Sequence, residues 1–122
     1  MSRLDRINEM MRREISEILH REIQDPRLTS VTITAVKVSP DLHQARVSFS
    51  VLMPTTVPDV QKGLDHARGY IRRLIGQRIE LRHIPEIEFF YDETIEYEAR
   101  IEKTFAEIKR DMPFDQGAAD GV

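Results

Sequence analysis

The order in which the apolar residues change their spacing constrains the fold of this chain more than any other feature. They recur at helical intervals near the N-terminus, alternate after residue 30, return to helical intervals, and alternate again after residue 85. Spacings of three and four place side chains on one face of a helix, whereas alternation places them on one face of a strand. The sequence therefore predicts a small α+β domain in the order helix, strand, strand, helical region, strand.

The first helix is expected over residues 3–24. Ser2 is a suitable N-cap, and Asp5 follows it three residues later in a form of capping box. Asp25 precedes Pro26, and this pair should end the helix because a residue before proline avoids the α region. The face expected to pack on the core carries Leu4, Ile7, Met11, Ile15 and Ile18.

Two strands, within residues 30–39 and 45–53, are expected to form an antiparallel pair joined by a turn containing proline and aspartate. The second strand alternates cleanly, and its core-facing residues should be Ala45, Val47, Phe49, Val51 and Met53. The first strand is less regular. Its two faces are expected to carry Val31, Ile33 and Ala35 on one side and Val36 and Val38 on the other, with both faces covered near its end.

The second helical region contains a glycine that its apolar face does not explain. Its stripe consists of Val60, Leu64, Ala67, Ile71, Leu74 and Ile75. Gly69 lies roughly opposite this stripe, although glycine inside a helix costs about 1 kcal/mol relative to alanine. Thr56 and Asp59 are expected to cap the start of the region, and Gly76 is expected to end it. We interpret Ala67-Arg68-Gly69 as a kink at which two helices meet.

The segment "QRIELRHIPEIEFFYDE" is expected to form an extended lead-in and a third strand, with Ile87, Phe89 and Tyr91 facing one way and Pro85 marking the start of the strand. Apolar residues then recur at helical spacing up to Met112. The prediction divides the chain into a domain over 1–94, an acidic amphipathic helix over 95–112 and a disordered tail over 113–122.

Charge is unevenly distributed along the chain, whose formal net charge is −3. Residues 1–82 carry 14 basic and 10 acidic side chains, whereas residues 83–122 carry 4 and 11. This asymmetry favours a basic working domain with an acidic tail, although surface charges can also fall this way by chance. Cysteine is absent, which excludes disulfides, zinc–thiolate sites and thiol nucleophiles. No long apolar run or signal peptide is visible, so a cytoplasmic protein without a membrane span is expected.

Several segments together resemble one protein family. A helix-kink-helix between the second and third strands is the arrangement of a type II KH domain, but the GxxG loop of ordinary KH domains is replaced here by the AxG pattern at residues 67–69. The segments "DPRLTSVTIT", "VKVSPDL" and "GYIRRLIGQRIELRHIPEIEFFYDET" occur in the order found in ribosome-binding factor A. The chain therefore resembles that family over roughly residues 3–101. The expected fold is α-β-β-α-kink-α-β with a three-stranded sheet, plus a C-terminal helix.

The resemblance implies a ribosome assembly factor. The expected partners are 16S rRNA and the free 30S small subunit rather than the 70S ribosome, and the expected roles are late maturation and 5′-end processing of 16S rRNA, including adaptation to cold. Neither the resemblance nor the residues indicate catalysis, a cofactor, a metal or a small-molecule substrate, and we expect a monomer. The four histidines are scattered and lack metal-ligand spacing, and no phosphate-binding P-loop is present.

Arginine side chains are the leading candidates for contacts with RNA, because their planar donors match pairs of phosphate oxygens. The candidate RNA-binding residues are Arg68, Arg72, Arg73, Arg78, Arg82, Lys37, Arg46, Arg3 and Arg6. For Gly69 the alternatives are a purely structural kink and a direct backbone contact with RNA. Phe90 and Tyr70 lie off the apolar stripes, where each could stack a base or cover the surface. The alternative functions are a protein-interaction module and a general RNA chaperone without preference for ribosomes.

Overall fold

The computed structural model describes residues 2–94 of the chain. Residues 1–92 belong to one compact unit, and the second unit begins at Glu93. The predicted acidic helix over 95–112 and the predicted tail over 113–122 lie outside the described residues.

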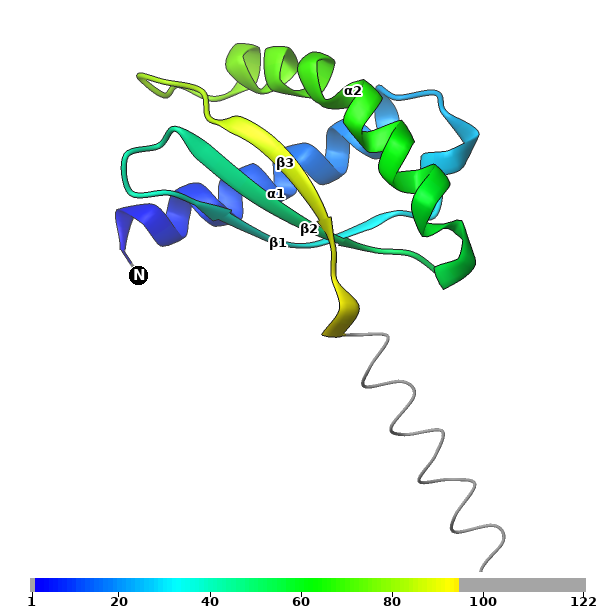
Figure 1. The fold of residues 1–122 in the computed structure, drawn as a ribbon. Helices are drawn as coiled ribbons and strands as arrows, with labels where there is room; N and C mark the ends of the chain where they lie inside the picture. Colours follow the sequence, from blue (N-terminus) through cyan, green and yellow to red (C-terminus); the bar gives the residue numbers. More distant parts are fainter. Residues whose placement is uncertain (1, 95–122) are drawn as a thin grey trace, which may run out of the picture. The chain divides into compact units, whose positions relative to one another are not determined.

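The first unit is an α+β domain with one three-stranded sheet (Figure 1). Its elements are α1 (Arg3–Arg21), β1 (Thr32–Val38), β2 (Gln44–Ser50), α2 (Val57–Arg78) and β3 (Glu86–Tyr91), with short 3₁₀ turns at Pro26–Leu28 (η1) and Pro54–Thr56 (η2). The sheet order is β1-β2-β3, with β1 and β2 antiparallel and β2 and β3 parallel. A parallel pair needs a crossover connection, and α2 provides it. This architecture agrees with the expected KH-like fold.

Both helices cover the same face of the sheet. α1 packs against β1 and α2, and α2 packs against β3. The core-facing residues of β2 and β3 alternate with exposed ones, and Ala45, Val47, Phe49, Ile87 and Phe89 are all buried. The other face of the sheet is therefore open among the described residues, as the alternation predicted for the second strand requires.

The irregular pattern of the first strand has a local cause. The pairing of β1 with β2 shifts between Ile33 and Ala35, so Thr34 is an extra residue. Such a bulge reverses the alternation, and residues on both sides of it reach the same face. Ile33, Val36 and Val38 are consequently all buried, whereas Ala35 is exposed. The prediction that Ala35 shares a face with Ile33, with Val36 and Val38 on the other face and both faces covered near the end of the strand, was wrong.

The first helix begins as expected and ends earlier than expected. The Ser2 hydroxyl accepts a hydrogen bond from the Asp5 amide, and the Asp5 carboxylate accepts one from the Ser2 amide, which completes the capping box. Ile7, Met11, Ile15 and Ile18 are buried, as the stripe predicts. The helix ends at Arg21 rather than at residue 24, because Glu22 already has the backbone angles of a C-cap and the chain then turns into η1.

α2 is one continuous helix from Val57 to Arg78. The segments on either side of Ala67-Arg68-Gly69 are parts of this helix, which changes direction along its length (Figure 1). Gly76 does not end the helix as predicted, since it has no positive φ angle and helical bonding continues past it. The Thr56 side chain does not cap the start of α2 as predicted, and its hydroxyl instead donates to the carbonyl of Met53, the residue before η2.

The strand expected to run to Met53 ends at Ser50. Pro54 begins η2, and the chain leaves the sheet before it. Leu52 and Met53 are therefore 84% and 63% exposed, and Met53 does not face the core as predicted.

Candidate nucleic-acid interface

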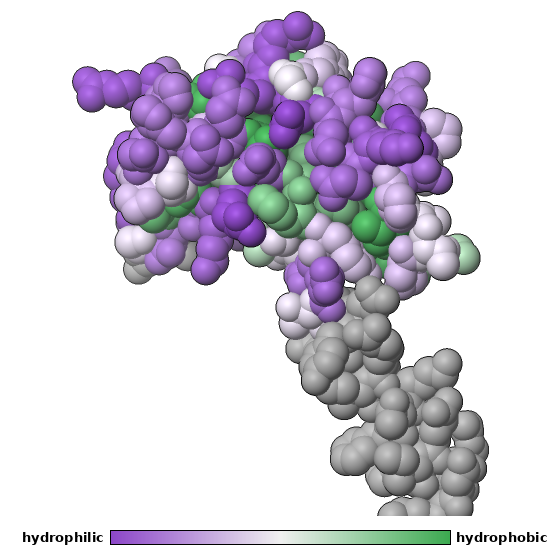
Figure 2. Space-filling model, in the orientation of Figure 1, coloured by the Kyte–Doolittle hydropathy of each residue, from purple (hydrophilic) through white to green (hydrophobic). Residues whose placement is uncertain are grey.

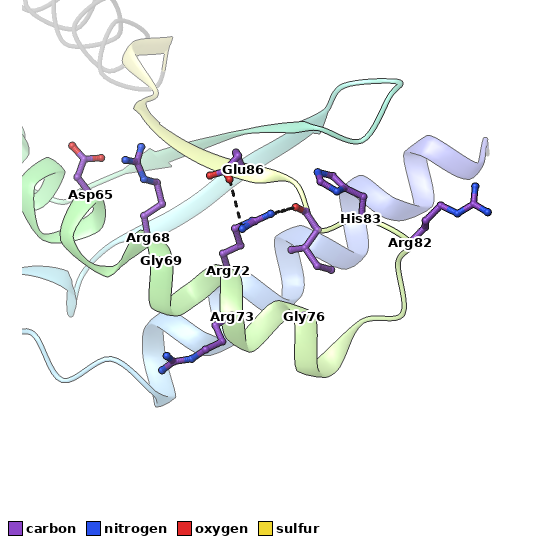
Figure 3. A pocket seen from close by; sticks show the side chains of 10 residues that line it. Asp65, Arg68, Gly69, Arg72, Arg73, Gly76, Arg82, His83 and Glu86 are labelled. Atoms are coloured by element: carbon purple, nitrogen blue, oxygen red, sulfur yellow. Dashed lines mark hydrogen bonds and ion pairs between the residues drawn. The ribbon is translucent and has the colours of Figure 1, made fainter.

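The outer side of α2 and the loop before β3 form a groove of about 650 Å³ (Figure 3). Four arginines of the predicted cluster line it, together with Gly69, Gly76, His83 and Ile84. Asp65 and Glu86 are the acidic residues on its wall. The structure therefore brings most of the arginines between residues 68 and 82 to one region, as the sequence suggested, but their individual environments differ.

Arg72 is bound to its own chain. Its guanidinium donates to the backbone carbonyls of Ile84, at 2.7 Å from Nη2, and of Pro85, at 3.1 Å from Nε. Glu86 adds an ion pair at 3.6 Å, and Figure 3 shows the guanidinium directed toward these groups. These contacts join α2 to the segment that leads into β3, so Arg72 positions the wall of the groove and has fewer donors left for a ligand.

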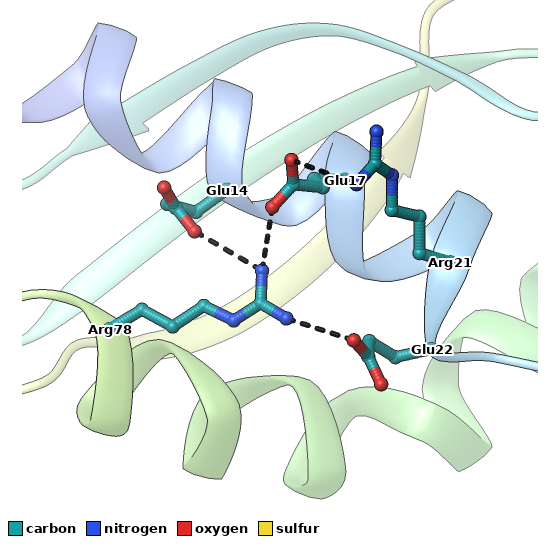
Figure 4. A network of polar contacts seen from close by, with 5 residues as sticks. All are labelled: Glu14, Glu17, Arg21, Glu22 and Arg78. Atoms are coloured by element: carbon teal, nitrogen blue, oxygen red, sulfur yellow. Dashed lines mark hydrogen bonds and ion pairs between the residues drawn. The ribbon is translucent and has the colours of Figure 1, made fainter.

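Arg78 is also occupied, at the contact between the two helices (Figure 4). Its guanidinium lies 3.4 Å from Glu14, 2.9 Å from Glu17 and 3.1 Å from Glu22, all on or next to α1. Partial desolvation opposes the charged form, but the hydrogen bond to Glu14 and the three carboxylate charges raise the pKa of Arg78. The positive charge of Arg78 is therefore offset by these three carboxylates.

Arg68, Arg73 and Arg82 remain available. All three are exposed, and none has a salt bridge within residues 2–94. In Figure 3, Arg73 points away from Glu86 on the far side of α2, and Arg82 points away from Arg72 along the loop. The unneutralised positive charge of this region therefore comes from these three side chains.

The other candidates lie on different elements. Lys37 and Arg46 are cross-strand partners on the open face of the sheet, and the Arg46 guanidinium carbon lies 3.9 Å from the centre of the Phe90 ring. Arg3 and Arg6 are exposed in the first turns of α1. Figure 2 shows that charged and polar residues cover much of the visible surface, with apolar residues between them. The nine candidates thus belong to three parts of the domain.

Gly69 is exposed and has open space around it. A Cβ atom built on it would meet no other heavy atom within 4 Å, and its φ angle is not positive. By contrast, a Cβ atom on Gly63 would lie 3.1 Å from Leu28 Cδ2. Packing within residues 2–94 therefore accounts for the glycine at 63 but not for the one at 69.

One contact in this region has no signal in the sequence. The rings of His43 and His83 lie with their centroids 4.5 Å apart, which joins the turn between β1 and β2 to the loop before β3. Forty residues separate them along the chain, and no spacing pattern in the sequence pairs them. The Glu86 amide donates to the His43 carbonyl beside this contact, so it supports the start of β3.

Within residues 2–94, no three histidine or acidic side chains are arranged to hold a metal ion. In the same part of the chain, neither α1 nor α2 has the length and apolar character needed to cross a membrane.

Comparison with known proteins identifies relatives along most of the chain. The family model described as ribosome-binding factor A matches residues 3–105. Ribosome-binding factor A of Lacticaseibacillus casei is 44% identical over 110 residues, which cover 88% of this chain and 94% of that protein. The protein of the same name from Coxiella burnetii is 42% identical over 99 residues, covering 81% and 83%.

Solved structures with the same fold have similar names. The solution structure of a putative ribosome-binding factor A from Thermotoga maritima has a TM-score of 0.60 and 31% identity, covering 77% of this chain and 93% of that one. The crystal structure of ribosome-binding factor A from Thermus thermophilus has a TM-score of 0.67 at 21% identity, covering 74% and 97%. A model of the Thermus thermophilus protein fitted into an electron-microscopy map of its 30S complex has a TM-score of 0.60 at 22% identity, covering 70% and 90%.

Proposed function

Because the chain belongs to the ribosome-binding factor A family, we propose that it binds the small ribosomal subunit through the arginine side of α2. The observation that carries the proposal is the match to this family along nearly the whole described domain. A relative with the same fold has been fitted into a 30S complex. The protein acts by binding, with no reaction of its own, and it works in the cytoplasm.

Phosphate contacts supply the attraction in this proposal. Arg68, Arg73 and Arg82 are exposed and carry charges that no carboxylate within residues 2–94 pairs with. Arginines that neutralise phosphates release counterions, which gives affinity that falls steeply with salt. Arg72 and Arg78 contribute indirectly, because their guanidinium groups hold the two ends of this surface in place.

The finer role follows from the same premise. The protein binds 16S rRNA in the free 30S subunit rather than in the 70S ribosome, and it promotes late maturation and 5′-end processing of that RNA, above all in the cold. A factor of this kind stabilises one conformation of its target by differential binding and then leaves.

A specific observation favours a second function, that of a protein-interaction module. Leu52 and Met53 form an exposed apolar pair beside the start of α2, which suits a surface that docks another protein. Binding of that kind would depend little on salt, whereas binding to RNA phosphates depends on it strongly. A general RNA chaperone would instead bind free RNA and small subunits without preference.

Co-sedimentation tests the proposal. The full chain is mixed with purified small subunits, large subunits and 70S ribosomes over a salt series. We expect retention on small subunits that decreases with salt. Retention on no particle at any salt, or equal retention on all three, would contradict the proposal.

Matched variants then test the site. Arg68→Gln with Arg73→Gln removes two charges from α2, whereas Arg13→Gln with Arg21→Gln removes from α1 two exposed charges that are not among the candidates. The first pair should weaken retention and reduce the slope of log affinity against log salt by about 1 for each phosphate that is no longer neutralised. The second pair should leave that slope close to the value of the unmodified protein. Equal effects of the two pairs would show that only the overall charge of the protein matters.

A further inference from the structure

Tyr70 is a large aromatic side chain on the outer side of α2. It is 38% exposed and lies outside the hydrophobic core. His66, Tyr70, Arg73 and Gln77 are spaced four, three and four residues apart, which places them along one side of the helix, and all are exposed. A tyrosine ring has a large apolar area and a polar hydroxyl, so a partly exposed tyrosine is suited to contact with a ligand.

Arg73 is held next to this ring. Its guanidinium carbon lies 5.2 Å from the ring centroid, within the range of a cation–π contact. Arg73 is one of the residues that line the groove, and in Figure 3 its side chain extends from α2 in the direction away from the Arg72–Glu86 ion pair. Aromatic rings flanked by arginine are the combination on which single-stranded nucleic acids stack their bases.

The charge around Tyr70 is positive. From His66 to Arg78, α2 carries four arginines and no acidic residue. Of these, Arg72 and Arg78 are paired with carboxylates, whereas Arg68 and Arg73 have no carboxylate partner within residues 2–94. A polyanion is therefore attracted to this stretch of the helix more than a neutral or basic partner is.

Gly69 provides access between the two free arginines. It precedes Tyr70 directly, and nothing lies within 4 Å of the position that a Cβ atom would occupy. A polynucleotide backbone can approach a helix most closely where no side chain projects. At Gly69 it could cross the helix from the side of Arg68 to the side of Arg73, which extend from α2 in opposite directions (Figure 3).

We propose that Gly69, Tyr70 and Arg73 form a site for one unpaired base of single-stranded RNA. The base stacks on the Tyr70 ring, and the flanking phosphates contact Arg68 and Arg73. The inference deepens the proposed function and rests on it, because it names an unpaired nucleotide, rather than duplex RNA, as what this side of α2 recognises.

The first test measures binding of the full chain to a fluorescein-labelled oligoadenylate of about ten nucleotides. Tyr70→Leu should lower the affinity about 5- to 100-fold, the range that loss of one stacked base produces, whereas Tyr70→Phe should stay within about twofold of the unmodified protein. A control chain of the same length without bases, and the same oligonucleotide in a duplex, should both bind more weakly. Equal binding of the chain without bases would overturn the proposal, as would unchanged affinity of Tyr70→Leu.

A second test does not depend on loss of function. The chain contains no tryptophan, so Tyr70→Trp introduces a single indole whose fluorescence reports only this position. Stacking of a base should quench it on addition of oligoadenylate, with a midpoint at the dissociation constant measured with the labelled oligonucleotide. Binding without quenching would place the RNA elsewhere and overturn the site.

The base site at Tyr70 and the proposed binding to small subunits can be refuted separately. If Tyr70→Leu weakens retention on small subunits but not binding to oligoadenylate, Tyr70 contacts a ribosomal protein, and the base site is wrong. If the unmodified protein is not retained on small subunits while the Tyr70 results hold, the base site stands as a site for single-stranded RNA and the proposed function fails.

Discussion

Replacing Gly69 by alanine should stabilise the protein and weaken its binding. The position lies inside α2, its φ angle is compatible with alanine, and an added Cβ atom meets nothing within 4 Å. The substitution therefore gains helix propensity and reduces the freedom of the unfolded chain without a steric cost. Together these effects amount to about 0.5–1 kcal/mol. For a domain of this size that raises Tm by roughly 2–8 °C.

The other helical glycines serve as internal controls for Gly69→Ala. In Gly63→Ala the new Cβ atom would lie 3.1 Å from Leu28 Cδ2, 3.2 Å from Asp25 Oδ2 and 3.3 Å from Arg27 Nε, so these side chains would have to move by a few tenths of an ångström. In Gly76→Ala it would lie 3.5 Å from Ile84 Cγ1, which is an ordinary contact. Thermal unfolding followed by circular dichroism should rank Gly69→Ala and Gly76→Ala above Gly63→Ala in Tm.

Stability and binding of Gly69→Ala must be measured together. A lower Tm for this variant would refute the reasoning, because it would show that the bend in α2 needs the glycine even though nothing packs against it. A higher Tm with weaker retention on small subunits would mean that the glycine is kept for contact with the ligand. A higher Tm with unchanged retention would contradict the close approach of RNA at this position.

Two further substitutions test one local ion pair, Asp25–Arg27, and one long-range contact, that of Arg78 with α1. Hydrogen bonds from the Arg27 side chain and then from its backbone amide lower the pKa of Asp25 below its ordinary value of 3.8. A carboxylate whose pKa is lowered by folding stabilises the fold above its unfolded pKa, and it loses that contribution as pH falls through the folded pKa. We therefore expect the difference in Tm between the unmodified protein and Asp25→Asn to decrease below about pH 3.8. Thermal unfolding measured from pH 6 to pH 2 tests this. If the difference in Tm instead increased as pH fell, the pKa of Asp25 would be raised by folding and not lowered. Arg78→Gln leaves Glu14, Glu17 and Glu22 without their shared cation, and it should lower Tm more than Arg21→Gln, whose ion pair with Glu17 is 4.0 Å long. High salt should reduce the difference in Tm between Arg78→Gln and Arg21→Gln, because it screens exposed ion pairs. Equal Tm values of the two variants would show that the contact of Arg78 with three carboxylates adds no stability.

The sequence by itself determined the local features of this domain. Helical spacing identified the buried face of α1, and the Ser2–Asp5 pair identified its start, because each depends on residues within one or two turns of each other. Strict alternation identified the core-facing residues of β2 and β3 for the same reason. The prediction that α2 ends at Gly76 was wrong, because a glycine permits a C-cap but does not require one. The helix continues to Arg78, and Ile79, which follows it, is buried in the core.

Only the tertiary structure decided which charges remain free. Five arginines between residues 68 and 82 look equivalent in the sequence, but Arg72 reaches carbonyls 12 and 13 residues away, and Arg78 reaches carboxylates 56 to 64 residues away. The bulge at Thr34 is likewise visible only in the pairing with β2. An arginine side chain is long, and its partner depends on which element folds against it. The packing of helices and strands therefore decides whether its charge is paired, and its neighbours in the sequence do not.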